Sequence, residues 1–429
     1  MIQYGGMSSE LSIAGLIALA AYLSVFTGLA GSLISRAPLF MAPVIWITKD
    51  LAVEKILGGF PWCQAGYSQF QNIYFIQVAE WGGIHLITFI LIGFNVLLYQ
   101  FFKRRNKTTA IALLASLACI YVTGYILYQI NENHTASLPT HHAGIIQPNT
   151  NNDYIELAEK HRILARLFRE SEQLVQQGAE FILWPEHSVA LYPLQNQEDC
   201  DLFLNFASTH VPLLAGFTDR QNYNEIYNSY ILFAKDRFEK YDKVHLAPFG
   251  EYVLFRKWLF FIKRITDEIG DFTPGAAVKN LTVNNHAVAT PICYEIIFPE
   301  LVRDFVANGA EVIVTGSNDS WFGDTSAPFQ HLGMAVFRSV ENRRYILRTT
   351  TNGISGVIAP SGNIVQRVPR SKPEHFIANF KYVGRTTVFT CCGYLFPYLC
   401  LVLTLGFFLG RRFLTWRKSK HTDKSYKLE

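Results

Sequence analysis

Long apolar runs alternate with charged clusters along the chain, and several of these runs are long enough to cross a lipid bilayer. A membrane-spanning helix needs about 20 consecutive apolar residues. Four stretches meet this requirement, and the last two contain no charged residue: 11–35, 81–102, 109–130 and 387–410. A fifth apolar stretch begins at Ala37 but meets four charged residues between Lys49 and Lys55. It predicts either a tilted span or an interfacial helix.

The basic residues predict how these spans are oriented. Lys and Arg gather at 103–107 and again at 411–427, whereas residues 57–80 contain neither. Basic loops stay on the cytoplasmic side of a membrane. We therefore expect a multi-pass membrane protein. It would have about four N-terminal transmembrane helices in residues 1–135, an exported domain at 136–386, and a final span with a basic cytoplasmic tail at 387–429.

The segment between the third and fourth spans has the mixed periodicity of an α/β domain. An amphipathic helix is expected at 156–177, with Gly178 as its C-cap, and a second helix at 294–308, ended by Gly309. Short apolar runs predict strands, at 181–184, 229–234, 286–292 and 312–315. Strands that alternate with helices favour a layered α/β arrangement.

Composition narrows the possible functions. The chain of 429 residues is 50% hydrophobic and only 17% charged, whereas soluble domains average about 25% charged residues. A net charge of +4 without a basic stripe gives no support for nucleic-acid binding. The twelve His and seven Cys residues lack metal-ligand spacing and do not form a disulfide framework. We expect no metal and no organic cofactor.

The strongest local chemical feature is Cys293, which a predicted strand delivers to the start of a predicted helix. A thiol at a helix N-terminus is favoured as thiolate, although a lone Cys on a strand is more often an inert apolar residue. Two charged loops change this balance. Glu186 follows an apolar strand in Trp-Pro-Glu, and Lys243 and Glu251 lie in an aromatic loop rich in Pro and Gly. Charges fixed among such residues need partners, because desolvation is costly.

The contexts of Glu186, Lys243 and Cys293 resemble the nitrilase (carbon-nitrogen hydrolase) superfamily. Together with the flanking spans they resemble its membrane branch, the apolipoprotein N-acyltransferases. Four further stretches match: Gly58-Gly-Phe-Pro-Trp-Cys-Gln-Ala-Gly-Tyr-Ser68, Asn318-Asp-Ser-Trp-Phe-Gly-Asp324, Pro328-Phe-Gln-His331 and Arg348-Thr-Thr-Thr-Asn-Gly353. The resemblance covers the chain from about Leu57 to the last span. It implies a nitrilase-like α-β-β-α sandwich inserted between transmembrane helices. It also implies a multi-pass protein of the cytoplasmic (inner) membrane, with its catalytic domain on the periplasmic side.

The sequence departs from the family pattern in two places. Family members usually carry more spans before the Gly-Phe-Pro-Trp loop, and here there are at most two. The Lys-Trp pair expected after Gln147-Pro-Asn149 is missing, and Asp153-Tyr154 occupies that region. The departures leave open how lipid enters and how the lipoprotein or acyl chain is recognised.

The resemblance implies an acyl transfer through a thioester. Cys293 would be the nucleophile, Glu186 the general base, and Lys243, with the N–H of Tyr294, the oxyanion donor. Glu251, Tyr294 and Glu295 would support them. The acyl donor would be a membrane phospholipid, in the family phosphatidylethanolamine giving its sn-1 chain, and the acceptor the N-terminal amine of a diacylglyceryl-cysteine apolipoprotein. We expect Lys243→Ala to be severe while leaving the fold intact.

Several alternatives remain open from the sequence. The same three residues would serve a membrane-anchored amidohydrolase with water as acceptor, and a non-catalytic scaffold related to such enzymes is a third reading. The basic amphipathic stretch 253–264 suits either a bilayer interface or the domain's own core. Trp321 and Phe322 would line an acyl path or pack in the core. A disulfide between Cys200 and Cys293 is possible, but the proposed chemistry argues against it.

Overall fold

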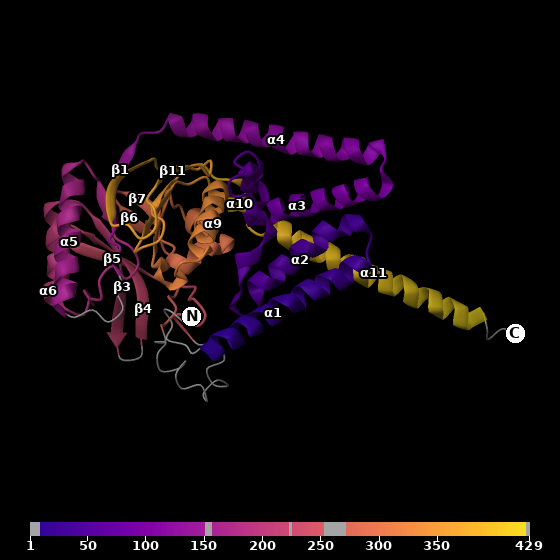
Figure 1. The fold of residues 1–429 in the computed structure, drawn as a ribbon, viewed down its shortest axis with the longest axis horizontal. Coiled ribbons are helices and arrows are strands. Elements are labelled where there is room, and N and C mark those ends of the chain that lie inside the picture. Colours follow the sequence, from indigo (N-terminus) through magenta and orange to yellow (C-terminus); the bar gives the residue numbers. More distant parts are fainter. Residues whose placement is uncertain (1–8, 151–156, 223–224, 253–271, 426–429) are drawn as a thin grey trace.

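The computed structural model describes residues 9–150, 157–222, 225–252 and 272–425. Its long helices lie at one end of the molecule and its β-sheets at the other (Figure 1). Two stretches discussed above, the amphipathic segment from Val253 and the Asp153-Tyr154 region, lie outside the described residues.

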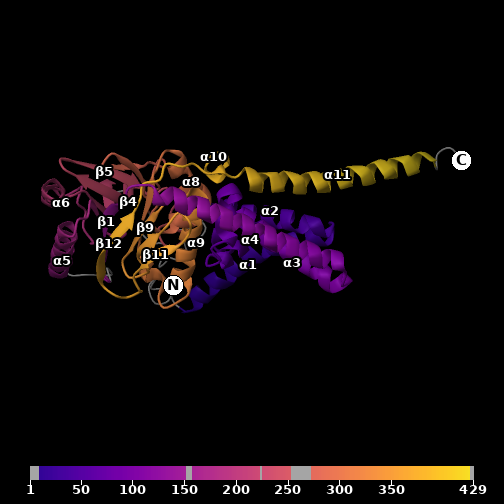
Figure 2. The same cartoon turned by 90° about the horizontal axis from the view of Figure 1, so that it is seen from above.

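Four helices among the described residues are long and apolar enough to cross a membrane. They are α1 (Ser9–Ser35), α3 (Ala79–Arg104), α4 (Lys107–Ala136) and α11 (Leu395–Ser425). The first three agree with the predicted runs. The last run was expected from residue 387, but the short helix α10 (Val388–Cys392) comes first and ends at Gly393, whose φ is +55°. Helix α11 begins after this turn and extends away from the sheets (Figure 2).

The fifth apolar stretch forms the short helix α2 (Ala42–Lys55), which packs between α1, α3 and α11. Its 14 residues rise about 21 Å, whereas the hydrocarbon core of a bilayer is about 30 Å thick. Helix α2 is therefore too short to cross a bilayer of that thickness by itself.

Helix α3 is broken near its start. Gly82 and Gly83 leave the helical conformation, and Gly83 has a φ of +66°. A side chain at Gly83 would collide with the ring of Phe389, at 2.7 Å. The N–H of Ile84, which follows the break, donates to Glu341 Oε1 at 2.8 Å. Through this hydrogen bond, the broken start of α3 is attached to helix α9 (Ala327–Asn342) in the other half of the molecule.

The strands form two sheets of six strands each. The first has the order β12-β1-β2-β3-β4-β5 and the second β11-β10-β9-β8-β7-β6. The first sheet contains β1 (His141–Gln147), β2 (Phe181–Leu183), β3 (Leu213–Asn222), β4 (Glu225–Ala234), β5 (Arg237–Asp242) and β12 (Glu374–Phe380). The second contains β6 (Leu281–Val283), β7 (His286–Ala289), β8 (Val312–Ser317), β9 (Ile346–Thr350), β10 (Gly356–Ile358) and β11 (Ile364–Arg367).

In the first sheet, side chains along a strand alternate between two cores, as the pleat of a strand requires. In β2, Phe181 and Leu183 belong to the core shared by the two sheets, whereas Ile182 packs with helices α5 (Leu157–Gln176) and α6 (Gln197–Thr209). Helices α8 (Pro299–Ala307) and α9 contribute to the core around the second sheet. The arrangement is an α-β-β-α sandwich, which confirms the predicted fold class.

Proline explains where the structure differs from the predicted elements. The strand expected at 286–292 ends at Ala289, shortly before Pro291, which has no N–H for a sheet hydrogen bond. The single helix expected at 294–308 is two elements, a 3₁₀ turn at Cys293–Ile297 and helix α8, which begins at Pro299. Proline is favoured at the first position of a helix, so it separates the two elements.

Candidate active site

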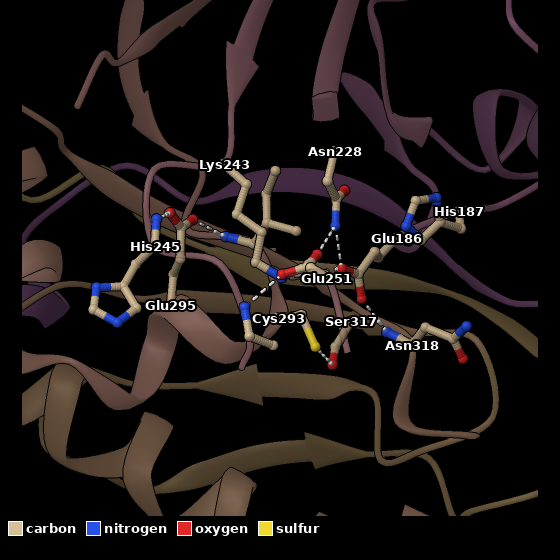
Figure 3. Close-up of polar contacts among 12 residues, drawn as sticks. Glu186, His187, Asn228, Lys243, His245, Glu251, Cys293, Glu295, Ser317 and Asn318 are labelled. Atoms are coloured by element: carbon tan, nitrogen blue, oxygen red, sulfur yellow. Dashed lines mark hydrogen bonds and ion pairs between the residues drawn. The ribbon is translucent and has the colours of Figure 1, made fainter. Parts of the chain in front are cut away.

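The structure brings Glu186, Lys243 and Cys293 together between the ends of the two sheets. Glu186 follows β2 and Lys243 follows β5 of the first sheet, whereas Cys293 follows β7 of the second. Figure 3 shows the three side chains in one cluster with Glu251 and Ser317. Residues that are far apart in the chain thus meet because their strands end at the same place.

Glu186 is held from three directions. Its Oε2 accepts a hydrogen bond from the backbone N–H of Asn318 at 2.7 Å, and its Oε1 accepts one from Asn228 Nδ2 at 2.8 Å. Lys243 Nζ lies 3.5 Å from the same Oε1. Burial by itself would raise the pKa of Glu186, but Lys243 and these hydrogen bonds outweigh it and hold the pKa below its usual range. The carboxyl group is therefore ionised at neutral pH.

Lys243 is almost completely buried, at 1% exposure, and contacts two carboxylates. Its Nζ donates to Glu251 Oε1 at 2.9 Å, in addition to its contact with Glu186. Burial would lower the pKa of Lys243, but Glu251 and then Glu186 raise it above its usual value. Asn228, on β4, donates to Glu251 Oε1 as well, at 2.6 Å, so one amide group bridges both carboxylates.

Cys293 has a backbone conformation that is rare for a residue other than glycine, with a φ of +48°. Its Sγ lies 3.2 Å from the hydroxyl oxygen of Ser317 at the end of β8. Cys293 and Cys200 are both free thiols, so the alternative of a disulfide between them is excluded.

The expectation that Cys293 rests as a thiolate is wrong. Burial, followed by the charge of Glu186, raises the pKa of the Cys293 thiol well above its usual value, and Lys243 offsets only part of this effect. The residues after Cys293 form a 3₁₀ turn of five residues, not the start of a long helix. The dipole of such a turn is small. The resting site thus contains a neutral thiol beside an ionised carboxylate.

Tyr294 and Glu295 connect the nucleophile to its surroundings. Glu295 Oε2 accepts from the N–H of Ile292, and its Oε1 accepts from the N–H groups of Val244 and His245, which follow Lys243. Burial raises the pKa of Glu295 to about 7. This side chain ties the Lys243 loop to the residues on either side of Cys293.

A loop from the membrane half reaches the site. Tyr294 donates a long hydrogen bond, 3.5 Å, to the carbonyl of Gly59, and His245 Nε2 lies 3.0 Å from the carbonyl of Gly58. In the same loop, the ring of Trp62 lies 5.7 Å from the ring of Phe322. Trp321 is 51% exposed, so the prediction that it packs in the core is wrong, whereas Phe322 is half-buried.

Sequence reasoning missed Asn228, Asn318 and Ser317. Asn228 precedes the predicted strand at 229–234 and is a buried polar residue next to an apolar run, which is the one signal that could have marked it. Asn318 acts through its backbone N–H, which no side-chain motif reveals. The contact of Ser317 with Cys293 depends on how β8 lies relative to β7.

The described residues contain no group of three or more His, Cys, Asp or Glu side chains placed to hold a metal ion. The cluster is built from one ammonium, two carboxylates and a thiol, and it has the parts for general-base and nucleophilic chemistry.

The chain matches two family models. The carbon-nitrogen hydrolase model matches residues 142–385, and the model of the apolipoprotein N-acyltransferase N-terminal domain matches residues 1–97. Among solved structures, Saccharomyces cerevisiae Nit3, a member of branch 10 of the nitrilase superfamily, has a TM-score of 0.45 and 19% sequence identity. That likeness covers 56% of this chain and 90% of Nit3.

Curated relatives named apolipoprotein N-acyltransferase match over both halves of the chain. The protein from Vibrio parahaemolyticus is 29% identical over 436 residues, which cover 95% of this chain and 84% of that protein. The Geobacter metallireducens protein is 29% identical, covering 85% of this chain and 74% of its own. The Aquifex aeolicus protein is 28% identical, covering 86% and 82%. The chain belongs to the carbon-nitrogen hydrolase family, in its membrane branch, the apolipoprotein N-acyltransferases.

Proposed function

We propose that this chain transfers a fatty acyl chain from a membrane phospholipid to the N-terminal amine of a diacylglyceryl-cysteine apolipoprotein, through a thioester on Cys293. The observation that carries the proposal is the cluster of buried Glu186 and Lys243 with the half-buried Cys293, in a chain with four helices long and apolar enough to cross a membrane. Family membership supports the acyltransferase reaction, and the cluster supports its chemical course.

The first half of the reaction moves the acyl chain to sulfur. Glu186 takes the thiol proton as Cys293 Sγ attacks the ester carbonyl of the phospholipid. The ammonium of Lys243 stabilises the oxyanion, with the N–H of Tyr294 as the second donor. When the tetrahedral intermediate collapses, Glu186 returns the proton to the leaving glycerol oxygen, so a lysophospholipid departs and the thioester remains.

The second half uses the same groups in reverse. The amine of the diacylglyceryl cysteine attacks the thioester carbonyl, and Glu186 accepts a proton from the amine. Lys243 again stabilises the oxyanion, and the thiolate of Cys293 leaves and regains a proton from Glu186. The products are an amide and the free enzyme. Glu251, Tyr294 and Glu295 have positioning roles, because they hold Lys243 and the backbone around Cys293.

The arrangement of basic residues supports a periplasmic, inner-membrane location for the cluster. The α3–α4 connection at 103–107 lies at the end of the helices remote from the sheets (Figure 1). At that end, Arg411 of α11 also hydrogen-bonds to the carbonyl of Arg36, between α1 and α2. Basic residues remain cytoplasmic, so the sheets would lie on the opposite, external side.

A membrane-impermeant maleimide tests this orientation in intact cells. A cysteine introduced by Lys372→Cys, before β12, should be labelled from outside. One introduced by Arg105→Cys should be labelled only after the inner membrane is opened. Labelling of each peptide is followed by mass spectrometry, because the chain has seven native cysteines. The reverse pattern would refute the proposed side.

The reaction is tested with purified protein and a phospholipid labelled in its sn-1 chain. We expect a labelled adduct on the peptide that contains Cys293, and its discharge when a synthetic diacylglyceryl lipopeptide with a free amine is added. Cys293→Ala should give no adduct. Cys200→Ala, which removes a buried thiol in α6, should behave as the unmodified protein.

Two other outcomes would replace the proposal. Discharge of the adduct by water at the same rate with and without lipopeptide would identify an amidohydrolase-type enzyme. Absence of any adduct on Cys293, with the protein folded, would leave a non-catalytic scaffold.

A further inference from the structure

Four residues that the reaction has not used meet at one buried polar cluster beside Cys293. Asp319, His331 and Arg348 come from three separate motif stretches, and Ser317 precedes the first of them. All four side chains are buried. We call these residues, Ser317, Asp319, His331 and Arg348, the Ser317 network.

The hydroxyl of Ser317 has one proton and two partners that can accept it. Its Oγ lies 2.6 Å from Asp319 Oδ1 and 3.2 Å from Cys293 Sγ. Asp319 is a carboxylate, because the charge of Arg348 above all outweighs burial and holds the pKa of Asp319 well below the usual range. In the resting enzyme the shorter contact marks the carboxylate as the acceptor. When negative charge forms on sulfur, rotation of the hydroxyl turns the same proton to Sγ.

The rest of the network fixes the geometry of this exchange. The carbonyl of Cys293 can only accept, so His331 Nε2, 3.0 Å away, carries a proton. His331 Nδ1 then accepts from Arg348 Nη2 at 3.1 Å, and the same Nη2 donates to Asp319 Oδ2 at 2.9 Å. His331 thereby holds the Cys293 backbone in its unusual conformation, with a φ of +48°.

Two packing contacts enclose the network. A Cβ at Gly353 would lie 2.1 Å from Asp319 Oδ2, so only glycine fits beside this carboxylate. On the other side, the ring of Trp62, from the loop of the membrane half, stacks on His331 with ring centroids 5.9 Å apart. These contacts restrict the positions of Asp319 and His331.

We propose that Ser317 is a further catalytic residue, whose hydroxyl donates to Cys293 Sγ each time charge develops on that sulfur. Asp319, His331 and Arg348 are positioning residues that aim the hydroxyl and hold the Cys293 backbone. The inference rests on the proposed function, because it assigns Ser317 a part in the same thioester chemistry.

Sulfur is negatively charged twice in each cycle. It carries charge when Glu186 removes the thiol proton, and again when the thioester breaks and the thiolate leaves. Ser317 forms and breaks no covalent bond in either step, since its proton remains on Oγ. A hydrogen bond from Ser317 lowers the barrier of both steps by stabilising the same atom.

Alkylation of Cys293 by iodoacetamide tests this role without any lipid. The rate is measured on the full-length protein across pH, by mass spectrometry of the peptide that contains Cys293. Ser317→Ala should slow alkylation about 10- to 100-fold at a fixed pH and move its pH midpoint upward, because a hydrogen bond to a charged group is lost. The formation and the discharge of the lipid adduct should slow together.

A second variant should shift the midpoint in the opposite direction. Asp319→Asn removes a negative charge that raises the pKa of the Cys293 thiol, and it weakens the competing acceptor for the Ser317 proton. Its alkylation midpoint should therefore move downward. A general loosening of the site would shift both variants in the same direction, and that outcome would overturn the inference.

The control is Thr315→Val, which removes a buried hydroxyl from the same strand two residues earlier. It should alkylate at the wild-type rate, and thermal unfolding of each variant reports whether the fold is kept. Wild-type rate and midpoint in Ser317→Ala would refute the role of Ser317 and leave the acyl transfer untouched. If no lipid adduct forms but the alkylation shifts are seen, the acyl transfer alone is refuted.

Discussion

At the scale of single residues, one buried ammonium is shared by two buried carboxylates. Lys243 contacts Glu251 and Glu186, and these three groups together carry one net negative charge. When Glu186 accepts the thiol proton, the three groups become neutral. Because the cluster holds the pKa of Glu186 below its usual range, Glu186 readily gives this proton up again to the leaving group.

This arrangement changes the expected effect of replacing Lys243 on the stability of the fold. From the sequence, Lys243→Ala is expected to spare the fold. However, Lys243 is 1% exposed and neutralises buried carboxylates, and breaking such a pair costs about 3–5 kcal/mol. Lys243→Met should therefore slow adduct formation by about 10²–10³ and also lower the thermal unfolding midpoint.

Adduct formation with labelled phospholipid and unfolding in detergent measure the two effects. Lys235→Met, at the exposed turn between β4 and β5, is the matched control and should change neither. A slow Lys243→Met variant with the wild-type unfolding midpoint would show that the carboxylates do not depend on this ammonium for their charge.

Glu186 gives the site a pH dependence in the acid range. The pKa of Glu186 in the folded protein lies below the ordinary value of 4.5. Ionised Glu186 therefore stabilises the fold above pH 4.5, and this contribution is lost as the pH falls through the lower pKa of the folded state. On going from about pH 6 to about pH 3, the wild type should lose more thermal stability than Glu186→Gln. The variant should also form the adduct at least about 10² times more slowly.

The control for this comparison is Glu198→Gln, at an exposed position of α6. Its loss of stability with falling pH should match that of the wild type. Equal acid sensitivity in Glu186→Gln and the wild type would contradict the lowered pKa.

At the scale of elements, the site depends on four strands that end close together, and on glycines that let them approach. Gly316 in β8 is one of these. A Cβ at this position would lie 2.4 Å from the ring of Tyr230 and 3.1 Å from the backbone nitrogen of Glu186. The strand can therefore pass beside the Glu186 turn only without a side chain here.

Gly316→Ala should push the Glu186 turn away from Cys293. Overpacking of a core costs about 1–3 kcal/mol, and a displaced base should slow adduct formation by at least about 10-fold. Gly384→Ala is the control, because a Cβ at Gly384 would have no atom within 4 Å. Wild-type adduct formation in Gly316→Ala would show that the turn tolerates the added methyl group.

The elements that the sequence predicted well have periodic apolar patterns. Helix α5 and strands β2 and β8 lie within a few residues of their predicted bounds, and Gly178 has the φ of +95° expected of a C-cap. The prediction was less accurate around Pro291, Pro299 and Gly393. A strand ends shortly before Pro291, a new helix begins at Pro299 within a predicted helix, and Gly393 ends a short helix before the last span.

The site was only partly predictable, for a physical reason. Glu186, Lys243 and Cys293 carry reactive groups at strand ends, and a resemblance to a known family connects them. Asn228 and Ser317 lie outside the motifs that carry the resemblance, and their part in the site comes from contacts with residues distant in the chain. Such contacts depend on how two sheets pack, which a local pattern does not encode.

At the scale of the whole molecule, buried ion pairs attach the sandwich to the membrane helices. Arg343 at the end of α9 is fully buried, and its Nε lies 2.6 Å from Glu80 Oε2 at the start of α3. Arg338, also in α9, pairs with Glu341 at 2.7 Å, and Glu341 accepts from Ile84 N. These groups are buried, so water cannot replace them as partners. They therefore join the two halves firmly.

Glu80→Gln should weaken this attachment, because it leaves the charge of Arg343 buried with a weaker partner. We expect a loss of up to about 3–5 kcal/mol in the free energy of unfolding, seen as a lower unfolding midpoint in detergent. The control is Glu172→Gln, on the exposed face of α5, which should unfold like the wild type. A wild-type unfolding midpoint in Glu80→Gln would show that this ion pair does not hold the two halves together.

The broken start of helix α3 also has a consequence for the order of synthesis. The N–H exposed by the break at Gly83 is satisfied by Glu341, which lies 257 residues later than its partner Ile84. A ribosome completes α3 long before it reaches α9. After synthesis, α3 must therefore wait, with an unpaired amide and the acidic Glu80, until the sandwich has folded and α9 packs against it. Folding of this early helix is complete only when a domain made much later in synthesis closes its first turn.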